Sequence, residues 1–130
     1  MAELAIGVEE VRAARVVLHG LLMRTPCLPA ASLSALTGAS VTVKYETLHA
    51  TGSFKERGAC VKLASLTPAE RVRGVVAMSA GNHAQAVAYH AARLGIPATI
   101  VMPVGTPLVK VENSRSHGAR IVLYLSLIHI

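Results

Sequence analysis

One lysine of the sequence stands where it could support covalent chemistry. It is Lys55, in the segment TGSFKERGA (residues 51–59), which we place after a strand and a loop, at the start of a helix. Flanking glycines allow a ligand to approach the backbone closely. The positive end of the helix dipole disfavours a protonated amine, and burial beside Phe54 would act in the same direction. A neutral amine is what Schiff-base chemistry requires. The alternative is a solvated surface lysine.

A second segment could bind an anion. SAGNHAQ (residues 79–85) occupies the turn from an apolar strand into an alanine-rich helix. The free N–H groups at a helix start bind carboxylates or phosphates. The alternative is that Ser79 or Asn82 is an ordinary helix N-cap. The glycine patterns of dinucleotide and P-loop sites are absent, so the sequence does not indicate a nucleotide.

The composition excludes several functions. With 52% hydrophobic and 15% charged residues, the 130-residue chain is not a disordered protein. The net charge of +6 arises from scattered basic residues, and only 3% of residues are aromatic, so nucleic-acid binding is not favoured. All seven acidic residues are Glu. Without Asp the chain cannot form a Ser-His-Asp triad, an aspartic dyad or an EF-hand loop.

The histidines and cysteines predict no metal site. His83 and His90 would lie about 10.5 Å apart along one helix, too far to share a zinc ion. Cys27 and Cys60 are expected to be free thiols, buried or half-buried, in a reducing compartment. We find no basic signal segment and no apolar run long enough to cross a membrane, so we expect a cytoplasmic protein.

Hydrophobic periodicity predicts the elements that position the two segments. Helices are expected over residues 8–22, 32–36, 54–66, 82–94 and 107–117, and strands over 41–45, 74–78, 97–102 and 120–124. From residue 74 onward, strands and helices alternate and the strands are short and apolar. This order is typical of an α/β fold whose parallel sheet has helices on both faces. Ligands of such sheets bind beyond the carboxyl ends of the strands.

Together the two segments resemble the threonine ammonia-lyase (threonine dehydratase) and serine racemase family of pyridoxal-phosphate enzymes. The resemblance includes RTP at 24–26, KYE at 44–46 and LGIPATIVMP at 94–103, followed by Thr106, Pro107 and Lys110. It covers approximately residues 9–124. It implies a tryptophan-synthase-β-like fold (fold type II) in a truncated form.

The resemblance also implies roles for individual residues. Lys55 would bond covalently to pyridoxal 5'-phosphate and then act as the base at the substrate Cα. Phe54 would border the cofactor ring, and Asn82 would hydrogen-bond the ring hydroxyl. The substrate carboxylate would lie in the loop formed by Ser79, Ala80, Gly81, Asn82 and His83. Serine racemases typically have Ser where this chain has Ala80, which favours elimination over racemisation. His49 replaces the Gln of many relatives and is interpreted as a tolerated loop variation.

The expected activity is that of a carbon-nitrogen lyase. Threonine would be converted to 2-oxobutanoate and ammonia, and serine to pyruvate, with isoleucine biosynthesis as the implied pathway. Serine racemase or a serine-preferring dehydratase of the same fold is an alternative, and so is a non-catalytic basic α/β module. The expected ligand is a small amino acid, with no nucleic acid and no membrane, and the parent protein is expected to be a homo-oligomer.

The domain organisation is expected to be incomplete. Residues 1–50 would form part of the large cofactor domain, and residues 51–124 the lysine-bearing helix and the small α/β domain. The glycine-rich loop that grips the cofactor phosphate in the family has no counterpart here, so we expect an inactive N-terminal fragment. Residues 125–130 (LSLIHI) correspond to a translated transposase adapter and are expected to be a non-native tail.

Overall fold

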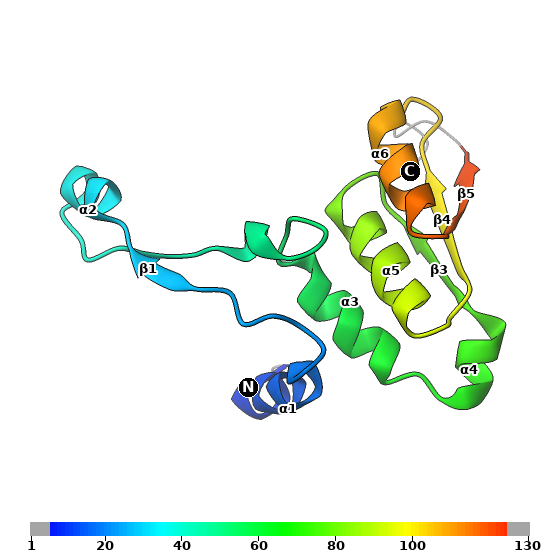
Figure 1. Ribbon diagram of the computed structural model, residues 1–130, viewed down its shortest axis with the longest axis horizontal. Helices are drawn as coiled ribbons and strands as arrows, with labels where there is room; N and C mark the ends of the chain where they lie inside the picture. The colour runs from blue at the N-terminus through cyan, green and yellow to red at the C-terminus, as the bar shows by residue number, and fades with distance from the viewer. Residues whose placement is uncertain (1–5, 125–130) are drawn as a thin grey trace, which may run out of the picture.

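The computed structural model describes residues 6–124. The helices are α1 (Val8–Leu18), α2 (Ala31–Thr37), α3 (Lys55–Ala64), α4 (Pro68–Arg73), α5 (Asn82–Arg93) and α6 (Leu108–Ser116), with a 3₁₀ turn at Glu46–Leu48. The strands are β1 (Cys27–Pro29), β2 (Thr42–Lys44), β3 (Val75–Met78), β4 (Ala98–Met102) and β5 (Arg120–Leu123). Figure 1 shows that helices α3 to α6 gather around strands β3 to β5, whereas the segment carrying β1 and α2 reaches away from them.

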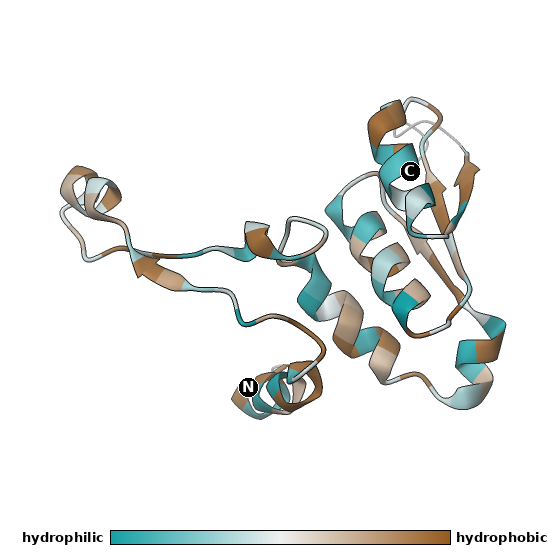
Figure 2. Cartoon of the chain, viewed as in Figure 1, coloured by the Kyte–Doolittle hydropathy of each residue, from teal (hydrophilic) through white to brown (hydrophobic). Residues whose placement is uncertain are grey.

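Strands β3, β4 and β5 form a parallel sheet in that order. Apolar side chains of β3 and β4 pack against α5, whose alanines allow the helix to lie close to the sheet. The buried core contains Ala59, Ala84, Ala86, Val87, Ala88, Ile100, Met102, Val111 and Ala119. Figure 2 shows the hydrophobic character of these strands. The parallel α/β class predicted from the sequence is therefore confirmed.

The prediction of helices on both faces of this sheet is wrong for the described residues. Val75 and Ala77 face the core under α5, but Val76 and Met78 on the opposite face are 75% and 60% exposed. The cause is the strand order. Right-handed crossovers that add each new strand on the same side put both connecting helices on one face. Covering the other face requires a reversal of strand order, which β3-β4-β5 lacks.

Helix α1 ends four residues earlier than predicted. Its last carbonyl, that of Leu18, accepts hydrogen bonds from the N–H groups of Leu21 and Leu22. Gly20, within this turn, has φ of +79°. A left-handed glycine ends a helix even where the apolar spacing continues. The apolar pattern of residues 19–22 therefore belongs to a turn.

Besides the 3₁₀ turn at Glu46–Leu48, two short elements were not predicted. Strand β1 pairs with β2 as an antiparallel ribbon, which leaves Cys27 exposed rather than buried or half-buried. Helix α4 follows Thr67, whose hydroxyl and backbone form a capping box with Glu70. The sequence T-P-A-E carries this helix-start signal. Cys60 is buried, as predicted.

Among residues 6–124, none of the helices has both the length and the hydropathy needed to span a bilayer. The proposed tail at 125–130 lies outside the described residues.

Candidate functional site

Lys55 is the first residue of α3, as the sequence predicts. Its backbone N–H donates to the Ser53 hydroxyl at 3.3 Å, although the N-cap residue of this helix is Phe54, which makes no side-chain capping bond. Lys55 is exposed, and its Nζ lies 5.0 Å from the centroid of the Phe54 ring, which is itself 60% exposed. The burial expected beside Phe54 is therefore wrong. The start of α3 presents both side chains to solvent, although Thr51 and Ser53 of the loop before it are buried.

The loop before Lys55 is fixed by its own hydrogen bonds. Gly52 has φ of +69°, a value that favours glycine, and its N–H donates to the His49 carbonyl at 2.9 Å. The Thr51 N–H donates to Oε1 of Glu56, in the first turn of α3. The Thr51 hydroxyl is buried and lacks a hydrogen-bond partner among the described residues.

The second segment forms the turn between β3 and α5. The Ser79 N–H donates to the Val101 carbonyl of β4 at 3.1 Å, and the Ser79 hydroxyl accepts from the Gly81 N–H at 3.2 Å. Helix α5 starts at Asn82, and its N-cap is Gly81, with no side-chain capping bond. The alternative in which Ser79 or Asn82 is an ordinary N-cap is therefore wrong. Asn82 and His83 are exposed, and the turn before them is half-buried.

The fold brings the starts of α3 and α5 to the same end of the molecule. The two helices pack against each other, and Figure 1 shows them side by side, both running away from that end. A cavity of about 190 Å³ lies between them and β3, lined by residues that include Gly58 and Ala59 of α3 and His83 and Val87 of α5. Because α5 follows directly from β3, this end lies beyond the carboxyl ends of the parallel strands, where α/β proteins bind ligands.

A charged cluster around Glu46 connects the N-terminal segment (residues 6–50) to α3. Glu46 accepts two hydrogen bonds from Arg57, at 2.6 and 2.8 Å, and one from the Thr25 hydroxyl at 2.6 Å. His49 Nε2 lies 3.1 Å from the same carboxylate, and Lys44 Nζ lies 3.6 Å from it. The Arg57 hydrogen bonds lower the pKa of Glu46 to about 2, against the opposing effect of its partial burial. His49 is buried in this cluster, so it does more than vary a loop.

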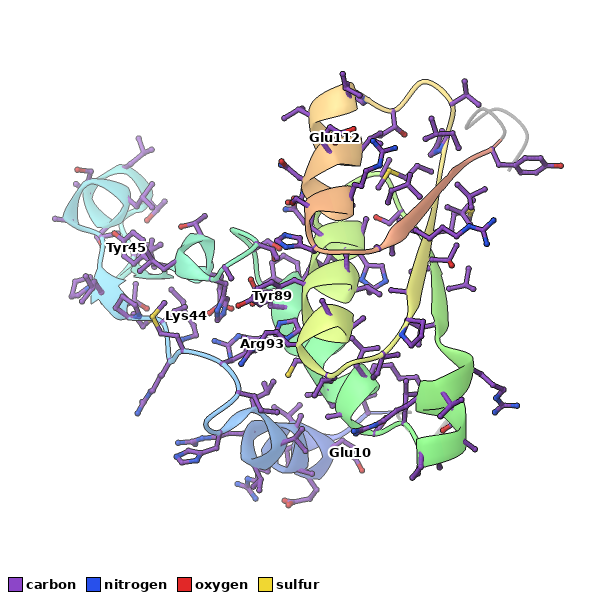
Figure 3. All side chains as sticks on the ribbon, turned by 45° about the vertical axis from the view of Figure 1, so that its right-hand side comes forward. Glu10, Lys44, Tyr45, Tyr89, Arg93 and Glu112 are labelled. Carbon is purple, nitrogen blue, oxygen red and sulfur yellow. The ribbon has the colours of Figure 1, made fainter. Side chains whose placement is uncertain are left out.

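A second connection runs from α5 to the N-terminal segment. The Arg93 guanidinium donates to the Leu21 carbonyl at 3.0 Å and lies 5.6 Å from the Tyr89 ring centroid. Figure 3 shows both side chains on the side of α5 that faces this segment. The residues after α1 are thereby tied to the helix that carries Asn82.

Sequence reasoning missed the residues that hold the site together. Glu46, Glu56 and Arg57 lie inside segments that we quoted, but no role was given to them. The spacing S-x-x-E from Ser53 to Glu56 resembles a capping box and could have indicated that Glu56 turns back toward the loop. His90 was considered only as a metal ligand and is in fact buried against Glu56.

Comparison with known proteins identifies the family to which the chain is similar. The family described as "Pyridoxal-phosphate dependent enzyme" matches residues 19–127. The chain is 48% identical over 118 residues to an L-threonine ammonia-lyase of Thermotoga maritima, a match that spans 91% of this chain and 29% of that protein. It is 50% identical over 107 residues to an L-threo-3-hydroxyaspartate ammonia-lyase of a Pseudomonas species, over 82% of this chain and 34% of that one.

A solved structure shows the same fold. Maize serine racemase superposes with a TM-score of 0.90 at 36% identity, over 97% of this chain and 38% of the racemase. The chain thus spans about a third of the length of the proteins it matches. Its fold is that of the fold-type II enzymes, and the chain belongs to the family of pyridoxal-phosphate-dependent enzymes.

Proposed function

We propose that this chain carries the lysine-bearing part of a pyridoxal-phosphate-dependent ammonia-lyase that dehydrates threonine, and also serine. The observation that carries the proposal is the shared end of the molecule at which α3 begins with Lys55 and α5 begins with Asn82. The L-threonine ammonia-lyase of Thermotoga maritima, at 48% identity, supports the reaction class. Isoleucine biosynthesis and a cytoplasmic location remain part of this proposal.

The residues at this end suit the cofactor. The Lys55 amine is exposed at a helix start, and the buried Thr51 hydroxyl four residues before it has no protein partner among residues 6–124. The first N–H groups of α5 have no acceptor within the helix and can donate hydrogen bonds to an anionic group. A ligand with an aldehyde and anionic substituents fits an amine beside such donors.

Each residue then has a defined task. Lys55 would hold the cofactor covalently, and its amine would later remove the proton from the substrate Cα. Asn82 would donate a hydrogen bond to the hydroxyl of the cofactor ring, and Phe54 would border the ring. The turn at residues 79–83 would hold the substrate carboxylate with its N–H groups. When bound, the cofactor supplies an electron sink that makes the Cα proton acidic. Threonine would lose its Cα proton and its β-hydroxyl together as one water molecule, and hydrolysis of the unsaturated product would consume one water and give 2-oxobutanoate and ammonia.

The experiment adds pyridoxal phosphate to the purified chain and records the visible absorbance of the cofactor on Lys55. We expect a band that Lys55→Ala abolishes and that Lys110→Ala, a change of an exposed lysine of α6, leaves intact. Release of 2-oxobutanoate from threonine is measured in the same samples. Because the family's glycine-rich phosphate loop has no counterpart among residues 1–130, turnover by the chain alone is expected to be weak. A band that persists in Lys55→Ala would refute the assignment of the lysine.

Serine racemisation is the second candidate function, favoured by the superposition on maize serine racemase. Racemisation requires a proton donor on the face of the substrate opposite the lysine. Position 80 is Ala, whose side chain has no proton to give, so we propose elimination as the main reaction. Chiral analysis of serine incubated with the pyridoxal-phosphate-loaded chain separates racemisation from elimination. D-serine that accumulates faster than pyruvate would favour racemisation.

A further inference from the structure

A buried carboxylate and a buried imidazole lie behind the proposed site and have no part in the chemistry described above. Glu56 is 1% exposed and His90 is 2% exposed. Glu56 Oε2 and His90 Nε2 are 3.1 Å apart, which joins the first turn of α3 to the third turn of α5. A carboxylate oxygen only accepts, so the histidine Nε2–H is the donor. A buried carboxylate without partners would be strongly unfavourable, and here both oxygens are used.

The other oxygen of Glu56 holds the loop before the lysine. Oε1 accepts from the Thr51 N–H, while the Ser53 hydroxyl accepts from the Lys55 N–H. The segment from Thr51 to Lys55 is thus attached at its beginning to Glu56 and at its end to Ser53. One carboxylate therefore joins three pieces: the loop, helix α3 and helix α5.

The location of this carboxylate matters for reactivity. Glu56 follows Lys55 directly in the chain, and His90 lies on the helix that begins with Asn82. Loss of the Glu56 carboxylate removes the hydrogen bonds that attach the loop to α3 and α3 to α5. Positioning a reactive amine against its ligand is worth large factors in rate, and small displacements are costly.

We propose that Glu56 and His90 are positioning residues, a pair that holds Lys55 in register with the Asn82 end of α5 so that its amine meets the cofactor aldehyde. The proposal rests on the proposed function, because it concerns the same lysine. It predicts more than a contribution to stability. Replacing a buried polar pair by apolar residues of similar volume is often neutral for stability, but it cannot restore the hydrogen bond to Thr51.

The test measures how fast each lysine of the full chain is captured by pyridoxal phosphate and borohydride. Mass spectrometry of the digested protein gives the capture rate at Lys55 and, as an internal reference, at the exposed Lys110 of α6. The wild-type chain is expected to prefer Lys55. Equal capture of both lysines in the wild type would refute the proposed function itself, and the positioning role with it.

Three variants then test the pair. In Glu56→Ala, and in the double change Glu56→Leu with His90→Leu, the preference for Lys55 should fall by about tenfold or more, as expected for losing a buried hydrogen bond to a charged group. In Glu56→Gln it should stay within about twofold, since the amide oxygen still accepts from Thr51 while its NH₂ donates to His90. The control is Glu112→Gln, an exposed glutamate of α6.

The double change keeps the test decisive if Glu56→Ala fails to fold. Its far-ultraviolet circular dichroism should match that of the wild type, and its urea midpoint should fall by less than that of Glu56→Ala, because only the Thr51 N–H is left without a partner. Reduced preference for Lys55 in this folded variant supports a positioning role. Full preference in the folded double variant would overturn it, and so would a loss in Glu56→Gln as large as that in Glu56→Ala.

Discussion

Two glutamates connect parts of this molecule in contrasting ways. Glu46 belongs to the N-terminal segment, is half-buried and is surrounded by positively charged groups, above all Arg57. Glu56 belongs to the α/β unit formed by residues 51–124. It is fully buried, and its carboxylate accepts hydrogen bonds from the Thr51 N–H and from His90. Both carboxylates attach another segment to the helix that carries Lys55.

The difference follows from the amount of solvent around each group. Near the surface, a carboxylate can gather cations at small desolvation cost, and the pairing responds to pH. In the core, desolvation lowers the pKa of His90, so that Glu56 is matched by hydrogen bonds to a neutral imidazole and not by a full positive charge. The N-terminal segment is thus joined to α3 by charge, and the site loop to α5 by buried hydrogen bonds.

The largest expected effect comes from truncating the two carboxylates separately. Glu56→Ala leaves the Thr51 N–H and the His90 imidazole buried without partners, so we expect a loss of about 3 kcal/mol in the free energy of unfolding. Glu46→Ala should cost about 1–2 kcal/mol, because Arg57 can turn to water. Urea denaturation of both variants gives the comparison. An equal or smaller loss in Glu56→Ala would contradict the distinction between buried and surface connections.

The two cysteines report on the same two regions. Cys27 is exposed on β1, whereas Cys60 is buried in α3, where desolvation raises the pKa of its thiol. We expect a maleimide to react at least about a hundredfold more slowly with Cys60, equivalent to ~2.7 kcal/mol of opening. Single variants Cys27→Ser and Cys60→Ser assign each rate. Similar rates for the two thiols in the native chain would contradict this expectation, because they would mean that Cys60 is as accessible to the reagent as the exposed Cys27.

How much of this could be read from the sequence depends on the range of the interactions. The positions of Lys55 and Asn82 at helix starts could be predicted because each lies within a short, recognisable segment, and the alternation of strands with helices predicted the parallel sheet. The partner of Glu56 lies 34 positions away, and no local pattern identifies His90 as that partner. The uncovered sheet face follows from strand order, which local periodicity does not contain. The end of α1 depends on the conformation of one glycine.

Acid should act on the two regions in separate pH ranges. Because the pKa of folded His90 lies below 6.5, the unfolded chain binds protons more readily, and stability falls as the pH drops below about 6.5. Glu46, with a folded pKa of about 2 and an ordinary value of 4.5, stabilises fully above pH 4.5, and this contribution is lost as the pH falls toward 2. The pKa difference sets an upper bound of about 3 kcal/mol on this second loss, and solvent screening near Glu46 should keep it to about 1–2 kcal/mol.

Matched variants separate these ranges. In urea titrations over pH, His90→Gln should flatten the first decline and leave the second, and Glu46→Gln should do the reverse. If Glu46→Gln left the decline below pH 4.5 unchanged, the Arg57 pairing would not be the source of acid sensitivity in the N-terminal segment.

The smallest effect concerns a single hydroxyl of the Glu46 cluster. Thr25 is buried, and its hydroxyl donates to Glu46 at 2.6 Å, while its carbonyl accepts from Lys44 Nζ at 2.9 Å. Thr25→Val removes only the first of these bonds, so we expect a loss of about 0.5–1 kcal/mol at pH 7. Thr37→Val, which removes an exposed hydroxyl bond to the Leu33 carbonyl, should change stability by less. Because Arg57 supplies two of the three shortest bonds to Glu46, a loss in Thr25→Val larger than that in Glu46→Ala would mean that the buried threonine, and not the charge, anchors the N-terminal segment.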